Sequence, residues 1–220
     1  MVITIDGPAG VGKTTTAKKL AKKLEFRYLD TGAMYRAITY FFIKNNVDIN
    51  SEEMVANFLD LLELEVDFPI DNQTKIVLGN KNISDDIRKK EVTDNVSKVS
   101  ALEKVREKTV RLQKKIVNNN DFVVEGRDIG TVVFPNAEYK FFLTADYDVR
   151  AKRRSKDFSK VDENLQIDDI KKDLIERDEI DSNRTLSPLK RAEDAIVIDT
   201  SNCTIDEQVD KIYNLSLIHI

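Results

Sequence analysis

The chain has little of several residue types that mark special classes of protein. Its 220 residues include one cysteine, no tryptophan, seven glycines and four prolines. Because Cys203 stands alone, it cannot form an internal disulfide bond, so nothing in the sequence requires an oxidising compartment. The few glycines and prolines leave no linker-like or low-complexity tract, and we therefore expect an ordered globular chain.

A strong charge imbalance and a long apolar run are absent as well. The formal net charge of −4 argues against a large nucleic-acid interface, which usually needs a basic surface. No stretch approaches about 18 uncharged apolar residues, and no basic leader with an apolar signal core precedes the first strand pattern. We therefore expect a soluble, cytoplasmic monomer whose partners are small molecules, with neither nucleic acid nor membrane among them.

Short apolar runs set the expected fold. They lie at residues 2–5, 122–124, 139–143 and 195–198, with long helical patterns between them. Near-continuous runs of this kind are typical of parallel strands covered on both faces. The alternation predicts an α/β fold, a parallel β-sheet flanked by helices, whose ligands bind at the carboxyl ends of the strands. The length of the chain fits one domain with insertions.

One segment departs from this pattern. Residues 65–83 alternate in hydrophobicity and carry turn signals such as Pro69, which predicts short antiparallel strands joined by turns. We expect a small inserted antiparallel β-subdomain at residues 65–100. A helical pattern returns at residues 89–116.

A glycine-rich motif follows the first expected strand. Gly-Pro-Ala-Gly-Val-Gly-Lys-Thr at residues 7–14 matches the pattern G-x-x-x-x-G-K-[ST], with a strand before it and a helical pattern after it. The glycines let successive N–H groups converge on phosphate oxygens at a helix N-terminus, which already favours anions. Lys13, which we expect on an exposed loop, adds a positive charge at the β- and γ-phosphates. An ordinary glycine-rich turn is the alternative, but a match by chance arises only about once in a hundred chains of this length.

The motif defines an expected ATP site with Mg²⁺. We assign to ATP binding Gly7, Pro8, Ala9, Gly10, Val11, Gly12, Lys13, Thr14 and Thr15. The Thr14 hydroxyl is placed to ligate Mg²⁺, a hard cation that keeps several waters, and Glu125 at the end of an apolar strand is a candidate to hold its water shell. The guanine-reading string Asn-Lys-x-Asp is not matched at residues 80–83, so a GTPase switch is disfavoured.

Three further strings accompany the phosphate loop. They are Asp-Thr-Gly-Ala-Met-Tyr-Arg at residues 30–36, Glu-Gly-Arg-Asp-Ile-Gly-Thr-Val-Val-Phe-Pro at residues 125–135, and Glu-Arg-Asp-Glu-Ile-Asp-Ser-Asn-Arg at residues 176–184. With the loop, and in the same order, they closely resemble bacterial cytidylate kinases, in the nucleoside monophosphate kinase group of P-loop kinases, over residues 2–209. Adenylate kinases have a related Thr-Gly-x-x-x-Arg element but lack the Gly-Arg-Asp-x-Gly-Thr string.

The resemblance implies a fold and a set of roles. It implies one P-loop kinase domain over residues 1–220, with a substrate-binding β-insert and a short lid at residues 150–168. Family arginines around the acceptor phosphate are matched by Arg36, Arg127 and Arg184, and the ribose contacts by Arg177 and Asp181. The cytosine-side contacts are matched by Thr31, Ser97, Arg106 and Asp128, with Thr31 standing where serine is also found.

The same residues make physical sense without the family. Arg177, Asp181 and Arg184 stand at i, i+4 and i+7, so they share one face if residues 168–184 are helical. The alternative is a solvated helix with an intrahelical ion pair, which for this stretch alone is about equally plausible.

A basic cluster after the third apolar run is expected to close over the triphosphate. It contains Arg150, Lys152, Arg153 and Arg154, of which we favour Arg153 and Arg154. Transfer of a phosphoryl group needs positive charge around its equatorial oxygens. A solvated basic surface is the alternative interpretation.

The sequence therefore predicts a phosphotransferase that moves the γ-phosphoryl group of MgATP to CMP or dCMP. Its expected catalytic residues are Lys13, Arg127, Arg184, Arg153 and Arg154. No general base is needed, because the acceptor phosphate already presents an anionic oxygen, and we leave Tyr35 out of the base-reading set. The alternatives are a P-loop kinase for another small acceptor, such as UMP or a non-nucleotide, and a non-catalytic ATP-binding module.

The last six residues, 215–220, raise a separate hypothesis. Leu-Ser-Leu-Ile-His-Ile matches a translated sequencing-adaptor end, and we expect it to interrupt the helical pattern that precedes it. We therefore treat residues 215–220 as a candidate non-native tail.

Overall fold

A computed structural model describes residues 1–68, 74–118, 120–158 and 166–217. The chain forms two compact units, each treated by itself below. Unit 1 contains Met1–Phe26 and Val123–Ile220, and unit 2 contains Arg27–Phe122. No helix in the described ranges is long and apolar enough to cross a membrane.

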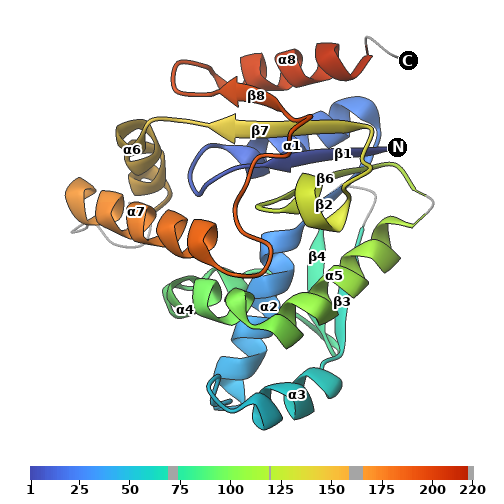
Figure 1. The fold of residues 1–220 in the computed structure, drawn as a ribbon, viewed down its shortest axis with the longest axis vertical. Coiled ribbons are helices and arrows are strands. Elements are labelled where there is room, and N and C mark those ends of the chain that lie inside the picture. The colour runs from blue at the N-terminus through green and yellow to red at the C-terminus, as the bar shows by residue number, and fades with distance from the viewer. Residues whose placement is uncertain (69–73, 119, 159–165, 218–220) are drawn as a thin grey trace. The chain divides into compact units, whose positions relative to one another are not determined.

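Unit 1 is built on a parallel sheet. Its strands lie in the order β6 (Phe122–Gly126), β1 (Val2–Asp6), β7 (Tyr139–Thr144) and β8 (Ile196–Asp199) (Figure 1). Strand β7 runs parallel to both β1 and β8. The four apolar runs of the sequence therefore become four strands of this sheet, and the predicted fold class is confirmed.

Helices α1 (Lys13–Leu24) and α8 (Ile205–Leu217) pack together in unit 1. The Thr16 hydroxyl donates to Gln208 Oε1 at 2.8 Å in their buried interface. At the surface, Lys19 Nζ lies 2.7 Å from Asp206 Oδ1. This helix pair fixes the segment that directly follows the phosphate loop.

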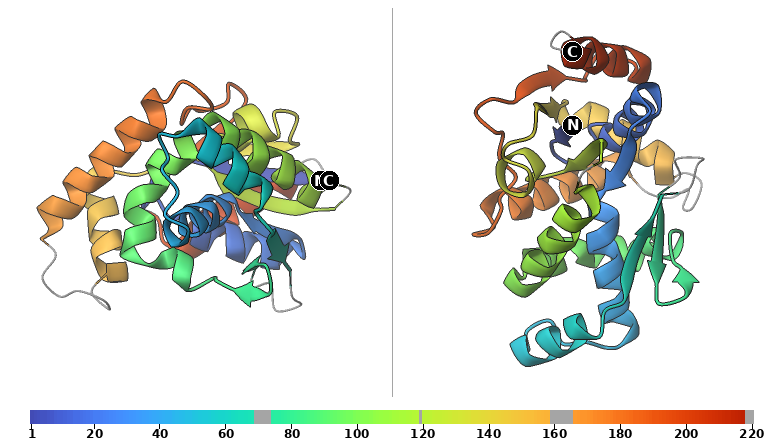
Figure 2. Two further views of the ribbon diagram at one scale, coloured as in Figure 1. Left: turned by 90° about the horizontal axis from the view of Figure 1, so that it is seen from below. Right: turned by 90° about the vertical axis from the view of Figure 1, so that its right-hand side faces the viewer.

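Helices α6 (Tyr147–Phe158) and α7 (Ile167–Asn183) form a second pair in unit 1. They lie side by side in the left view of Figure 2. Their apolar contact consists of Ala151, Ile170 and Leu174, and it includes Ala9 of the phosphate loop. Residues 159–165 of the predicted lid lie outside the described residues.

Unit 2 surrounds one long helix, α2 (Thr31–Lys44). The other elements are β2 (Arg27–Asp30), α3 (Glu52–Asp60), β3 (Leu64–Asp67), β4 (Lys75–Leu78), β5 (Lys81–Asn82), the 3₁₀ turn η1 (Asp86–Arg88), α4 (Lys90–Ala101) and α5 (Glu103–Val117). Because α2 carries buried residues on most of its faces, it packs against α4, α5 and β4 at once. The right view of Figure 2 shows the β3–β4 pair beside α2.

The small sheet of unit 2 agrees with the sequence pattern. Strand β4 pairs antiparallel with both β3 and β5, as expected for residues 65–83. Pro69 lies outside the described residues. Unit 2 is wider than the predicted insert at residues 65–100, and the assignment of that insert to substrate binding stays a prediction.

The helical pattern at residues 89–116 becomes two helices. The chain breaks at Leu102, whose φ of −66° and ψ of 128° are extended, so α4 and α5 are separate helices. Leu102 packs against the same apolar cluster as Val99 and Val105. The break therefore lets both helices direct apolar side chains at one core, which a continuous helix through this point would not do.

The expected interruption near the end of the chain is wrong. Helix α8 runs through Leu217, and the Ser216 hydroxyl is buried and donates to the Ile212 carbonyl at 2.8 Å. Residues 218–220 lie outside the described residues. The origin of residues 215–220 stays a hypothesis.

Candidate functional site

The phosphate loop connects β1 to α1 and leaves the first turn of α1 without a side-chain cap. Gly12 is the N-cap residue, with φ of 96° in the left-handed region, and the first turn holds no acidic residue. The loop begins at Gly7, where a Cβ would collide with the carbonyl oxygen of Leu143 at the end of β7. Uncapped N–H groups at a helix N-terminus suit an anion such as phosphate.

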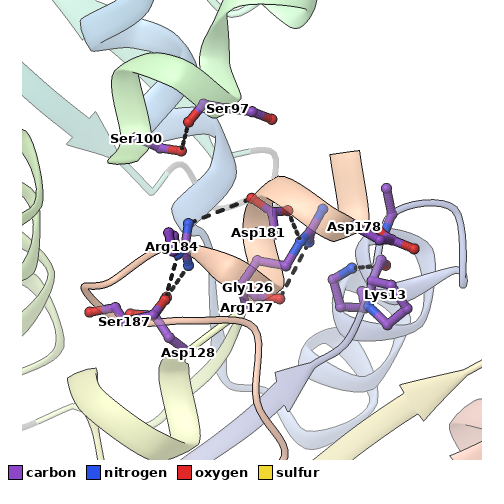
Figure 3. Close-up of polar contacts among 12 residues, drawn as sticks. Lys13, Ser97, Ser100, Gly126, Arg127, Asp128, Asp178, Asp181, Arg184 and Ser187 are labelled. Atoms are coloured by element: carbon purple, nitrogen blue, oxygen red, sulfur yellow. Dashed lines mark hydrogen bonds and ion pairs between the residues drawn. The ribbon is translucent and has the colours of Figure 1, made fainter. Parts of the chain in front are cut away.

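Lys13 is buried, which corrects the expectation of an exposed loop. It is 6% exposed, and its Nζ donates to the Pro8 carbonyl at 2.7 Å, so the loop folds around its own lysine (Figure 3). Burial lowers the pKa of Lys13 well below its usual value and Arg127 lowers it further, while Glu125 and Asp6 act in the opposite direction. An anionic ligand next to a desolvated cation of this kind strongly stabilises its charged form.

Arg150 and Asp178 clamp the first half of the loop. Arg150 is 2% exposed, and its Nε donates to the Ala9 carbonyl at 2.6 Å. Its Nη2 donates to Asp178 Oδ2 at 2.5 Å, while Asp178 Oδ1 accepts the Ala9 N–H at 3.3 Å. Both backbone groups of Ala9 are thus held by side chains from α6 and α7.

Arg153 holds the second half of the loop. Its Nη1 donates to the Val11 carbonyl at 3.3 Å and to Thr200 Oγ1 at 3.0 Å. Its Nη2 donates to the Thr200 carbonyl at 2.6 Å. Arg154 follows it on α6 and is partly buried. These contacts make Arg153 a support of the loop backbone, and the predicted role of both arginines in phosphoryl transfer stays a prediction.

Four predicted site residues meet in unit 1. Arg127 Nε donates to Asp181 Oδ2 at 2.9 Å, and Arg184 lies 3.6 Å from both Asp181 Oδ1 and Asp128 Oδ1 (Figure 3). Burial alone would raise the pKa of Asp181, but Arg127, Arg177 and Arg184 outweigh it and hold that pKa below its usual value. The sequence strings at 125–135 and 176–184 therefore converge on one alternating array of charges.

The predicted helix at residues 168–184 ends one residue early. Helix α7 stops at Asn183, and Arg184 is its C-cap residue with an extended ψ of 140°. Arg177 and Asp181 share the helix face, but Arg184 reaches the array because the chain turns away there. Its Nε donates to the Ser187 carbonyl at 2.6 Å, which fixes the side chain after the turn.

In unit 2, Arg36 is held by the residue that starts its helix. Asp30 caps α2 by accepting the Ala33 N–H at 2.8 Å, and its other oxygen accepts from Arg36 Nη2 at 3.0 Å. Burial alone would raise the pKa of Asp30, but Arg36, the Ala33 N–H and Arg88 outweigh it, so the pKa is lowered. The carboxylate stays charged and orients the arginine.

The predicted base-reading residues of unit 2 are all buried. Thr31 is the first residue of α2 and 2% exposed, and Ser97 on α4 is 9% exposed. Arg106 on α5 donates from Nη1 to the Ser100 carbonyl at 3.2 Å and lies 5.1 Å from the Tyr35 ring centre. Tyr35, which we left out of the set, is therefore a direct neighbour of Arg106.

The predicted metal residues also belong to unit 1. Thr14 is half-buried in the first turn of α1, and Glu125 on β6 is 4% exposed. Within the described ranges, no three His, Cys, Asp or Glu side chains form a metal-binding group. One hydroxyl and one carboxylate fit a hard cation that draws most of its ligands from water and phosphate.

Sequence reasoning did not single out three carboxylates that accept hydrogen bonds from the site residues or from the backbone beside them. They are Asp6, Asp30 and Asp178. Asp30 is the first residue of the string that carries Arg36, and Asp178 stands beside Arg177, so either could have been suggested by its position. Asp6 carried a weaker signal, a charged residue that ends an apolar strand.

Comparison with known proteins identifies the family. A family model described as cytidylate kinase matches residues 3–217. A cytidylate kinase of Lactobacillus johnsonii is 48% identical over 213 residues, covering 96% of this chain and 92% of its own. A cytidylate kinase of Clostridium botulinum (strain Langeland) is 47% identical over 213 residues, with 97% and 96% covered. One from Carboxydothermus hydrogenoformans is 44% identical over 215 residues, with 98% and 96% covered.

Solved structures agree on the fold. A shikimate kinase from Bacteroides thetaiotaomicron superposes with a TM-score of 0.52 at 14% identity, covering 98% of both chains. An uncharacterized protein from Eubacterium ventriosum gives 0.54 at 12% identity, with 98% of this chain and 97% of the other covered. These likenesses bear on the fold alone. The match over nearly the whole chain carries the assignment: this protein belongs to the cytidylate kinase family.

Proposed function

We propose that this chain transfers the γ-phosphoryl group of MgATP to CMP or dCMP, giving ADP and CDP or dCDP. Membership of the cytidylate kinase family implies the use of ATP and Mg²⁺ in general and small-molecule substrates. The phosphate loop is the observation that carries the proposal at the level of structure. It combines an uncapped helix N-terminus with a buried lysine, and both groups are suited to bind an anion.

On the donor side, residues 7–15 bind the phosphates of ATP. Lys13 exchanges its bond to the Pro8 carbonyl for bonds to the β- and γ-phosphates. This exchange is favourable because a buried ammonium gains more from a charged oxygen than from a neutral carbonyl. Thr14 would ligate Mg²⁺ and Glu125 would hold its water shell, and the metal would supply charge neutralisation on the phosphate oxygens.

On the acceptor side, three arginines receive the monophosphate. They are Arg36, Arg127 and Arg184, and each is already held by a carboxylate, Asp30 or Asp181. Arg177 and Asp181 contact the ribose. The cytosine is read by Thr31, Ser97, Arg106 and Asp128.

The chemistry then needs positioning and charge more than proton transfer. A monophosphate acceptor already carries an anionic oxygen, so no side chain has to act as general base. The arginines and Lys13 stabilise the charge that spreads over the equatorial oxygens of the transferred group. Arg153 and Arg154 add to this charge from α6. The protein is proposed to act as a monomer.

An acceptor panel tests the proposal. ADP release from MgATP is followed by a coupled assay with CMP, dCMP, UMP, AMP and a non-nucleotide alcohol as acceptors. The expected result is turnover with CMP and dCMP that far exceeds that with UMP, and its loss in Lys13→Ala. Turnover that is highest with another acceptor contradicts the proposed substrate, and ATP binding without acceptor-dependent turnover indicates a binding module.

A further inference from the structure

A buried carboxylate outside the predicted site lies beneath the turn that follows Arg127 and Asp128. Asp6 is the last residue of β1, is 5% exposed, and directly precedes the phosphate loop. Its Oδ1 accepts the N–H of Ile129 at 2.9 Å, and its Oδ2 accepts the N–H of Gly130 at 2.7 Å. Both oxygens of one carboxylate are therefore committed to two successive backbone donors.

These donors begin the π-helical turn η2 (Ile129–Val133). The first N–H groups of a helical turn need an acceptor, which is usually the side chain of the N-cap residue. Asp128 is the N-cap residue here, but its side chain does not cap the turn and instead lies 3.6 Å from Arg184. Asp6 supplies the cap from another strand, so Asp128 can direct its carboxylate elsewhere.

Close packing fixes the turn at the same point. A Cβ on Gly130 would lie 3.0 Å from Thr4 Oγ1, 3.2 Å from Lys140 Cδ and 3.4 Å from Asp6 Oδ2. Thr4 is fully buried, and its hydroxyl has no hydrogen-bond partner in the part of the chain that the structure describes. A Cβ at this position would be more tightly packed than most, so η2 or its neighbours on β1 would have to shift by a few tenths of an ångström.

We propose that Asp6 is a positioning residue for the acceptor nucleotide, which holds η2, and with it Arg127 and Asp128, in register with the phosphate loop. One residue then ties the donor loop, through the backbone, to the acceptor residues, through two hydrogen bonds. The inference rests on the proposed function. At about pH 8 Asp6 is ionised and accepts both bonds, since burial, with a contribution from Asp128, raises its pKa only to about 6 against the lowering effect of the two N–H groups and Lys13.

Asp6→Asn tests the role directly. An amide keeps the size of the side chain but offers one acceptor oxygen, so its NH₂ group faces one of the two N–H donors. We expect KM for CMP to rise about tenfold at about pH 8, while KM for ATP changes less than about twofold, because the loop backbone is untouched. Glu138→Gln is the matched control. Glu138 is an exposed carboxylate that accepts the Val2 N–H at 2.7 Å, at the other end of β1, and both KM values should stay as in the wild type.

Gly130→Ala tests the same contact without a change of charge. The new Cβ should lift η2 from β1 and raise KM for CMP selectively. Thr4→Ala removes the nearest atom, so the double variant Gly130→Ala/Thr4→Ala should regain part of the CMP affinity. A merely structural role would lower stability or change both KM values together, and would not give a rise in KM that is selective for CMP.

Two results would overturn the inference. One is an unchanged KM for CMP in folded Asp6→Asn, with folding verified by circular dichroism. The other is an equal rise in KM for CMP and ATP. If Asp6→Asn does not fold, the split between the two KM values in Gly130→Ala decides. A wild-type enzyme that does not phosphorylate CMP refutes the proposed function instead, so the two failures are distinct.

Discussion

The free energy of unfolding should depend on pH through Asp6. Its pKa rises from the ordinary value of 3.8 to about 6, mainly because the carboxylate is buried. The folded state therefore binds the proton more tightly than the unfolded chain does. This contribution to stability is complete below pH 3.8 and is lost as the pH rises through about 6. At about 1.4 kcal/mol per pKa unit the full effect is about 3 kcal/mol, of which about 2 kcal/mol falls between about pH 4.5 and about pH 7.5.

Urea unfolding of the wild type and of Asp6→Asn across this pH range measures the effect. The amide does not titrate, so other groups cancel in the difference between the two proteins. We expect the free energy of unfolding of Asp6→Asn, measured relative to that of the wild type, to rise by about 2 kcal/mol from about pH 4.5 to about pH 7.5. Glu138→Gln controls for the loss of one negative charge. A difference that stays constant within about 0.5 kcal/mol would refute the reasoning, because Asp6 would then titrate alike in both states.

Three further predictions concern the proposed reaction. Lys13→Ala should lower kcat by about a hundredfold or more while circular dichroism shows a retained fold, since the variant removes a phosphate-directed charge. Arg36→Ala and Arg184→Ala should each lower kcat/KM by about tenfold or more for CMP and UMP alike, and a loss confined to CMP would contradict a phosphate contact. Asp128→Asn should reduce the ratio of kcat/KM for CMP to that for UMP by about tenfold, chiefly by lowering CMP turnover, because an amide can donate to the uracil carbonyl. An unchanged ratio would place base recognition elsewhere.

Local sequence was enough for the elements whose patterns are local. The runs at residues 2–5, 122–124 and 139–143 became strands because near-continuous apolar residues need burial on both faces. The run at residues 195–198 became the edge strand β8, which leaves Ile196 and Val197 exposed. The phosphate loop was readable because its geometry depends on glycine spacing and on the helix that follows. Strand β2 was missed, because Arg27 and Asp30 leave only two apolar residues between them and no near-continuous apolar run.

Local periodicity failed where tertiary packing overrode it. Residues 89–116 have one continuous helical pattern, yet the chain breaks at Leu102 because both halves serve the same core. Arg184 continues the i, i+4, i+7 spacing, yet it lies beyond the end of α7. Lys13 belongs to a loop that reads as exposed, and it is buried by its own backbone.

The sequence by itself determined the fold class, the phosphate loop and the family, because each depends on residues close together in the chain or on their order. Only the tertiary structure decided how the charged residues are paired. Asp6 caps a turn 123 residues away, and Arg150 reaches Ala9 across 141 residues. Such pairings follow from which strands and helices become neighbours in the packed unit. No spacing along the chain encodes that arrangement, because it is fixed by the burial of whole faces of the sheet and its helices.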